Sequence, residues 1–160
     1  MNFKVFIRNI FIVMVATLVL SACATKTATL PSQIQGDVYT GTDTVEYLAK
    51  GVPDRVFFAT NESVLTTASR DTLRKQAAWM RTNDSLSFTI EGHADERGTR
   101  EYNLALGERR ANAARDYLMT YGVSQNRLTV ISYGKERPIN SGSNPLAWSQ
   151  NRRSVTVKAN

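Results

Sequence analysis

The sequence predicts an α/β (α+β) fold in which two long helices pack on one face of a small mixed sheet. Two observations lead to this class. Apolar residues recur at helical spacing within 66–82 and 103–121, and short β-favouring runs stand before, between and after these stretches. The resulting order of elements is β-α-β-α-β-β, which would bury both apolar helix stripes in a two-layer sandwich of about 105 residues.

Three elements open the predicted domain, which spans 54–160. A Val-Phe-Phe run that ends in a turn-like sequence predicts a strand at 54–58. A helix is expected at 66–82, because its apolar residues follow helical spacing and a Ser or Thr stands where the helix begins. Alternating apolar and polar residues predict a half-buried strand at 86–91.

The second half of the domain repeats this pattern after a polar loop. A long helix is predicted from about Asn103 until Gly122 stops it. A β-favouring run closed by Tyr-Gly predicts a strand over 128–134, and 135–145, with two prolines, is expected to be a loop. A Pro-Leu-Ala-Trp sequence then indicates a short helix, and two alternating valines near the C-terminus mark the last strand.

The first 22 residues have the layout of an export signal. Lys4 and Arg8 precede an apolar run, 10–20, that is shorter than the about 20 residues needed to cross a bilayer. The run ends in Leu-Ser-Ala before Cys23, the only cysteine of the chain, which looks like a bacterial lipobox. The alternative is an ordinary signal peptide with an incidental Cys23. Because an unpaired thiol is a liability in an oxidising compartment, acylation of the cysteine is favoured.

The domain organisation therefore reads as a lipoprotein signal peptide at 1–22, an acylated Cys23 with a flexible tether over 23–53, and the folded domain. The tether is inferred from its richness in Thr, Ser, Gln and Gly and its few large apolar residues, with a short structured piece as an alternative at 45–48. Loss of the two basic residues of the signal lowers the net charge from +6 to +4. A net positive charge as small as this does not indicate nucleic-acid binding, and no nucleic-acid partner is expected.

The stretch 91–111 holds a dense group of charged side chains and the only histidine. Glu91, His93 and Asp95 alternate, which raises the possibility of a metal site, but no second His or Cys exists in the domain to complete it. His93 is expected instead to be a hydrogen-bonding residue that holds the loop against the sheet. No metal or other cofactor is predicted.

Carboxylates in the same stretch could also serve as an acid–base pair. A hydrolase of glycan or peptide needs one carboxyl with a raised pKa. Here arginines flank the acids, and adjacent cations favour the ionised carboxylate. The chain is therefore predicted not to be an enzyme, and a hydrolase that uses Glu91 and Asp95 remains an alternative.

A binding site fits these residues better. Asp95 lies in a loop after a strand, and Arg110 flanks the buried face of the following helix, from where it can point towards that loop. An acid and a base opposed in this way would accept a ligand that carries both an ammonium and a carboxylate. Asn103 and the backbone near Thr99 could add uncharged contacts. The simpler alternative is that Asp95 and Arg110 pair with each other or with neighbours as a surface ion pair, worth about 0–1 kcal/mol.

Several separated motifs of the domain resemble one known family. They are Gly-His-Ala-Asp-Glu-Arg-Gly-Thr at 92–99, Leu-Gly-Glu-Arg-Arg-Ala at 106–111, Ser-Tyr-Gly-Lys-Glu at 132–136 and Asn-Arg-Arg at 151–153. In this order they resemble the OmpA-like C-terminal domain family, and the lipobox and tether resemble its lipoprotein members.

The resemblance implies non-covalent binding of peptidoglycan through the diaminopimelate of the stem peptide. In this family an aspartate and an arginine hold the charged end of the ligand, and they correspond here to Asp95 and Arg110. The helix-opening asparagine and the threonine after the loop glycine correspond to Asn103 and Thr99. Phe58 is a further candidate, although the aspartate that usually follows this phenylalanine in the family is replaced here by Ala59.

The resemblance also implies a cellular location and binding partners. The residue after the cysteine is Ala24 and not Asp, which in bacterial lipoproteins implies sorting to the outer membrane, with the domain in the periplasm. The implied partners are peptidoglycan, the outer membrane through the lipid anchor, and TolB with other Tol proteins, which act in envelope integrity and cell division. A protein-interaction module without direct wall binding remains the other alternative.

Overall fold

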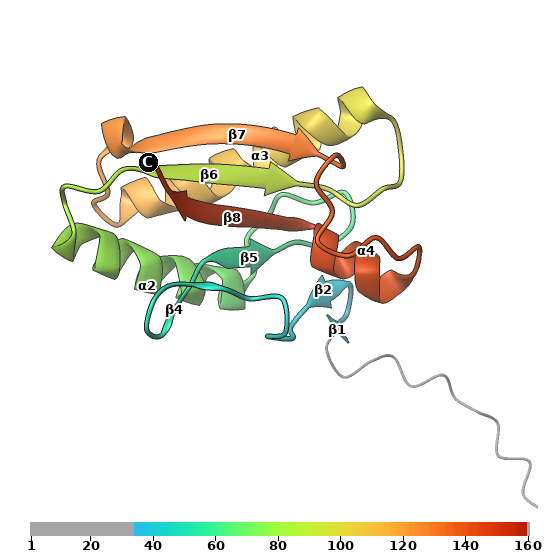
Figure 1. Cartoon of the computed structure of the whole chain (residues 1–160), viewed down its shortest axis with the longest axis horizontal. Helices are drawn as coiled ribbons and strands as arrows, with labels where there is room; N and C mark the ends of the chain where they lie inside the picture. Colours follow the sequence, from blue (N-terminus) through green and yellow to red (C-terminus); the bar gives the residue numbers. More distant parts are fainter. Residues whose placement is uncertain (1–33, 160) are drawn as a thin grey trace, which may run out of the picture.

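A computed structural model describes residues 34–159 and contains one mixed sheet covered on one face by two long helices (Figure 1). The sheet has the strand order β5-β8-β6-β7. Strands β6 and β7 run parallel, whereas β8 is antiparallel to both β5 and β6. The strands of this sheet are β5 (Arg55–Phe57), β6 (Phe88–His93), β7 (Leu128–Gly134) and β8 (Arg153–Lys158). The two long helices are α2 (Thr67–Thr82) and α3 (Arg100–Thr120), and a short helix, α4 (Pro145–Asn151), precedes β8.

This arrangement confirms the predicted fold class and the order of its elements. The core lies between the sheet and the helices, as the apolar spacing predicted. Its buried side chains come mainly from β5, β6, α2 and α3, with Phe58 directly after β5 and Leu128 at the start of β7. They include Val56, Leu73, Met80, Phe88, Ile90, Ala111 and Leu118. None of the helices in 34–159 is long and apolar enough to cross a membrane.

Helix α3 begins earlier than expected, at Arg100 and not near Asn103. Thr99 is its N-cap, because its hydroxyl accepts a hydrogen bond from the backbone N–H of Tyr102 at 3.2 Å. The helix ends where Gly122 adopts φ +84°, as the sequence indicated. A 3-10 turn at Gln125–Arg127 then leads into β7.

Two glycines bring α3 unusually close to the sheet. A Cβ atom at Gly92 would overlap the backbone carbonyl of Gly107, and one at Gly107 would overlap the side chain of Ser132. Only a residue without a side chain fits at these two positions. The close approach brings the middle of α3 next to the end of β6, where the predicted site residues lie.

The prediction of a flexible tether over 23–53 is wrong for the part that the structure describes. Residues 34–53 form two short hairpins, β1 (Ile34–Gln35) with β2 (Val38–Tyr39) and β3 (Tyr47–Ala49) with β4 (Val52–Pro53). Tyr39 is 2% exposed and packs edge-on against Phe57, with ring centroids 4.8 Å apart. Figure 1 shows β1 and β2 beside α4, next to the folded domain. The predicted signal peptide and Cys23 lie outside the described residues.

Candidate functional site

A pocket of about 310 Å³ lies where β6 ends and α3 begins. Three of the predicted site residues, Asp95, Asn103 and Arg110, line it together. The remaining lining residues are Thr60, Asn61, Arg97, Gly98, Tyr102 and Leu106. The structure therefore brings an acid, two amides and two arginines to one cavity, as expected for a site that takes a doubly charged ligand.

Arg110 is fully buried and is held by three backbone carbonyls. Its Nε donates to Glu62 O at 2.8 Å, one terminal nitrogen to His93 O at 2.8 Å, and the other to Ala59 O at 2.9 Å. Burial lowers its pKa to about 10, so the side chain stays charged at neutral pH. A guanidinium has five N–H groups, and two of them have no protein acceptor within 34–159.

Asp95 is also buried, and its carboxylate is ionised. It accepts hydrogen bonds from the backbone N–H and the guanidinium of Arg97, the shortest at 2.6 Å, and from Arg152 at 3.2 Å. Burial alone would raise the pKa of Asp95, but these hydrogen bonds outweigh it and hold the pKa below the usual range. An acid of this kind cannot act as a general acid at neutral pH, which argues against the hydrolase alternative.

Asp95 and Arg110 are not paired with each other in the described structure. Each is held instead by neighbours, Asp95 by two arginines and Arg110 by main-chain oxygens. The alternative of an ion pair between the two is therefore wrong, whereas Asp95 does form ion pairs with its neighbours Arg97 and Arg152. Both charges are fixed in position before any ligand arrives, which reduces the entropy lost on binding.

The other predicted site residues have different positions. Asn103 lines the pocket and holds the loop, since its side-chain amide donates to Arg97 O at 2.8 Å. Thr99 caps α3 and does not line the pocket. Phe58 is fully buried in the core, and the Arg110 guanidinium lies over its ring at 5.3 Å from the centroid. Phe58 therefore packs against a residue that lines the pocket and does not line it itself.

Arg152 is a site residue whose role the sequence reasoning missed. It is 2% exposed and binds Asp95, Phe58 O and Asp37. The sequence placed it only within an Asn-Arg-Arg motif. Its role follows from the antiparallel pairing of β8 with β6, which sets the start of one strand beside the end of the other. That pairing joins residues far apart in the chain and leaves no local pattern.

His93 does not hold the loop by side-chain hydrogen bonds, contrary to expectation. Its ring is 2% exposed and lies on Tyr133, with centroids 5.6 Å apart, and neither ring nitrogen has a hydrogen-bond partner in the described part of the chain. Its Nε2 is 3.4 Å from a Glu91 carboxylate oxygen, yet burial and nearby arginines lower the pKa of His93 to about 3. The ring is therefore neutral. Residues 34–159 contain no cluster of three or more His, Cys, Asp or Glu that could hold a metal ion.

The depressed pKa of His93 predicts a loss of stability in mild acid. Below about pH 6.5 the unfolded chain binds a proton at His93 that the folded chain does not accept until about pH 3. The free energy of unfolding should fall by about 2 kcal/mol between pH 6.5 and 5, since one pH unit corresponds to about 1.4 kcal/mol. Urea denaturation at a series of pH values measures this. Because His93 is the only histidine, the His93→Gln variant should not show this fall in the free energy of unfolding between pH 6.5 and 5. The same fall in the variant as in the wild type would contradict the prediction.

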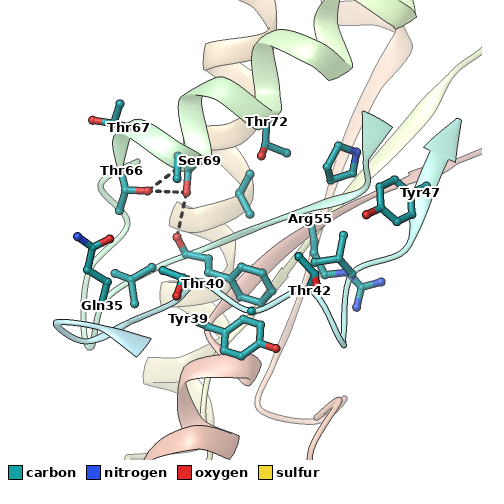
Figure 2. Close-up of a pocket in the computed structure, with 17 residues that line it drawn as sticks. Gln35, Tyr39, Thr40, Thr42, Tyr47, Arg55, Thr66, Thr67, Ser69 and Thr72 are labelled. Atoms are coloured by element: carbon teal, nitrogen blue, oxygen red, sulfur yellow. Dashed lines mark hydrogen bonds between the residues drawn. The ribbon is translucent and has the colours of Figure 1, made fainter. Parts of the chain in front are cut away.

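A larger cavity of about 520 Å³ lies between the N-terminal hairpins, β5 and the start of α2 (Figure 2). Its walls are mostly threonines and apolar residues, and the dashed lines in Figure 2 show Ser69 bonded to Thr66 and to the Phe57 carbonyl. Arg55 is its one charged lining residue and is already paired with Asp54 at 2.7 Å. This cavity lacks the opposed charges of the smaller pocket.

Comparison with known proteins gives consistent matches. The family model described as "OmpA family" matches residues 57–152. A peptidoglycan-associated lipoprotein of Rhizobium meliloti is 47% identical over 155 residues, covering 94% of this chain and 88% of the relative. One from Brucella melitensis is 46% identical over 153 residues, covering 92% of this chain and 90% of the relative.

Solved structures also match this chain. The crystal structure of the peptidoglycan-associated lipoprotein from Burkholderia pseudomallei has a TM-score of 0.65 at 35% identity, covering 66% of this chain and 90% of that one. The C-terminal domain of Helicobacter pylori MotB, at 19% identity and a TM-score of 0.62 over 67% of this chain and 84% of that one, shares the fold.

Proposed function

The chain belongs to the OmpA family and, within it, to the peptidoglycan-associated lipoproteins, and from this premise we propose that its pocket binds the diaminopimelate of the peptidoglycan stem peptide. The free end of this residue carries one ammonium and one carboxylate. The observation that supports the proposal is the presence of an ionised Asp95 and a charged, buried Arg110 in one pocket. The family is one of binding proteins, and no catalytic step is involved.

The ligand's ammonium would bind Asp95 and its carboxylate would bind Arg110. All four hydrogen bonds that Asp95 accepts come from Arg97 and Arg152. Of these two, the Arg97 side chain is 43% exposed, whereas that of Arg152 is 2% exposed. We infer that the ammonium displaces the Arg97 guanidinium, which then lies at the pocket mouth and can meet the ligand's carboxylate.

The anchor completes the proposed role. A lipid on Cys23 would hold the domain at the outer membrane, in the periplasm, and the bound wall would link the two layers together with TolB and the other Tol proteins. Because 34–53 is packed on the domain, only about ten residues separate Cys23 from the first described strand. Fully extended, they span about 35 Å. The domain therefore acts close to the membrane surface.

Ligand comparison by isothermal titration calorimetry tests this function. The ligands are two stem peptides that differ at one residue, meso-diaminopimelate or lysine, so that the α end of this residue is in peptide linkage. Both residues keep the distal ammonium, and lysine lacks the distal carboxylate. A charge-assisted hydrogen bond contributes about 1.5–3 kcal/mol, so diaminopimelate should bind at least about tenfold more tightly. Equal affinities would show that Arg110 and Arg97 do not bind the carboxylate, and release of muropeptides from purified sacculi would favour the hydrolase instead.

A further inference from the structure

The segment that precedes the folded domain touches the wall of the ligand pocket. The Asp37 carboxylate accepts a hydrogen bond from the backbone N–H of Thr60 at 2.6 Å and another from the Arg152 guanidinium at 2.8 Å. Arg152 also donates to the backbone carbonyl of Asp37. The neighbouring Tyr39 is buried against Phe57, so the segment is held by packing as well as by charge.

These contacts belong to a closed ring of polar groups. From Asp37 the ring passes to Thr60, whose hydroxyl accepts from Arg97 at 3.2 Å. Arg97 binds Asp95 at 2.6 Å, and Asp95 binds Arg152 at 3.2 Å. Arg152 then returns to Asp37. Three members of the ring, Thr60, Arg97 and Asp95, line the ligand pocket, so a change at Asp37 acts on the pocket from outside.

The pocket loop that Asp37 holds is under backbone strain. Asn61 has φ +58°, the only positive φ of a non-glycine residue in 34–159, and it lines the pocket next to Thr60. Such a conformation persists only where surrounding contacts fix it. On one side Arg110 holds the carbonyls of Ala59 and Glu62, and on the other Asp37 holds the amide of Thr60.

Asp37 also affects how strongly Arg152 binds Asp95. Arg152 divides its donors between the two carboxylates. Without the negative charge of Asp37, Arg152 would have Asp95 as its one remaining acidic partner in the described structure. An incoming ammonium would then compete with a more strongly bound arginine.

We propose that Asp37 is a positioning residue of the pocket, and that the segment 34–43 is therefore part of the ligand site. This inference rests on the proposed function. It implies that occupancy of the pocket and attachment of the segment 34–43 stabilise each other, so that detachment of this segment weakens binding to the wall.

The test compares Asp37→Asn with Asp43→Asn in the full-length chain. Asp43 lies on the same segment and accepts a hydrogen bond from Gln150, but it does not line the pocket and forms no hydrogen bond or ion pair with a pocket residue in the described structure, which makes it a matched control. Asp37 is 53% exposed, so its substitution should weaken meso-diaminopimelate binding by about fivefold, with little change in Tm. Amide hydrogen exchange at Thr60 should become faster in Asp37→Asn alone.

Outcomes separate this inference from the function it rests on. A wild type that binds diaminopimelate, with Asp37→Asn binding equally and Thr60 exchange unchanged, would overturn the role of Asp37 and leave the proposed function standing. A wild type that binds no diaminopimelate would overturn both. Equal weakening by Asp43→Asn would show that the segment acts through general packing, and would also overturn the role of Asp37.

Discussion

Replacing Arg110 with alanine is expected to lower the free energy of unfolding by about 3–5 kcal/mol and to abolish wall binding. The side chain is fully buried, and its removal leaves the carbonyls of Ala59, Glu62 and His93 without their donor. Each buried group left unpaired costs about 1–3 kcal/mol. Arg110→Lys keeps the charge but cannot reach all three carbonyls in the geometry of a guanidinium, and should also be destabilised.

Chemical denaturation of wild type and variant measures the first part of this prediction. Thr66→Ala is the control, because it removes the N-cap of the other long helix, α2, and Thr66 does not line the ligand pocket. It should cost about 1 kcal/mol of stability and leave diaminopimelate affinity unchanged. An Arg110→Ala protein within about 1 kcal/mol of wild type would show that the three carbonyl contacts do not stabilise the fold.

Asp95→Asn is expected to weaken binding strongly. Asparagine keeps the size and shape of the side chain but removes the charge that would meet the ligand's ammonium. Loss of one partner of a buried charge pair costs about 2–5 kcal/mol, so affinity should fall by at least about thirtyfold. Sacculus pull-down and calorimetry both measure it. Binding within about threefold of wild type would remove Asp95 from the site.

The sequence predicted the elements whose burial follows a regular period. The apolar spacing of Leu104, Ala111, Ala114 and Leu118 indicated α3, and all of these but Leu104 are buried. The alternation around Phe88 and Ile90 indicated β6. The hairpins of 34–53 were missed, apart from the short structured piece at 45–48 that overlaps β3, because their composition is polar and their anchoring depends on single long-range contacts. The bond between Asp37 and Arg152 joins residues 115 positions apart, which no local pattern can indicate.

The candidate site was predictable to a similar extent. Asp95 and Arg110 followed from loop and helix position together with a family resemblance, and the structure brings both to one pocket. Thr99 carries a role that the sequence could also have suggested, since a threonine just before a helix is a common N-cap. Arg152 depends on strand pairing and was not predictable in this way.

The most direct test of the central claim is a crystal structure of the chain soaked with meso-diaminopimelate. The account predicts electron density in the pocket of about 310 Å³, with the ammonium about 2.8 Å from Asp95 and the carboxylate about 2.8 Å from Arg110. The Arg97 side chain should have left Asp95. Ligand bound in the larger cavity of Figure 2, or bound in the pocket with no contact to Asp95 and Arg110, would contradict the account.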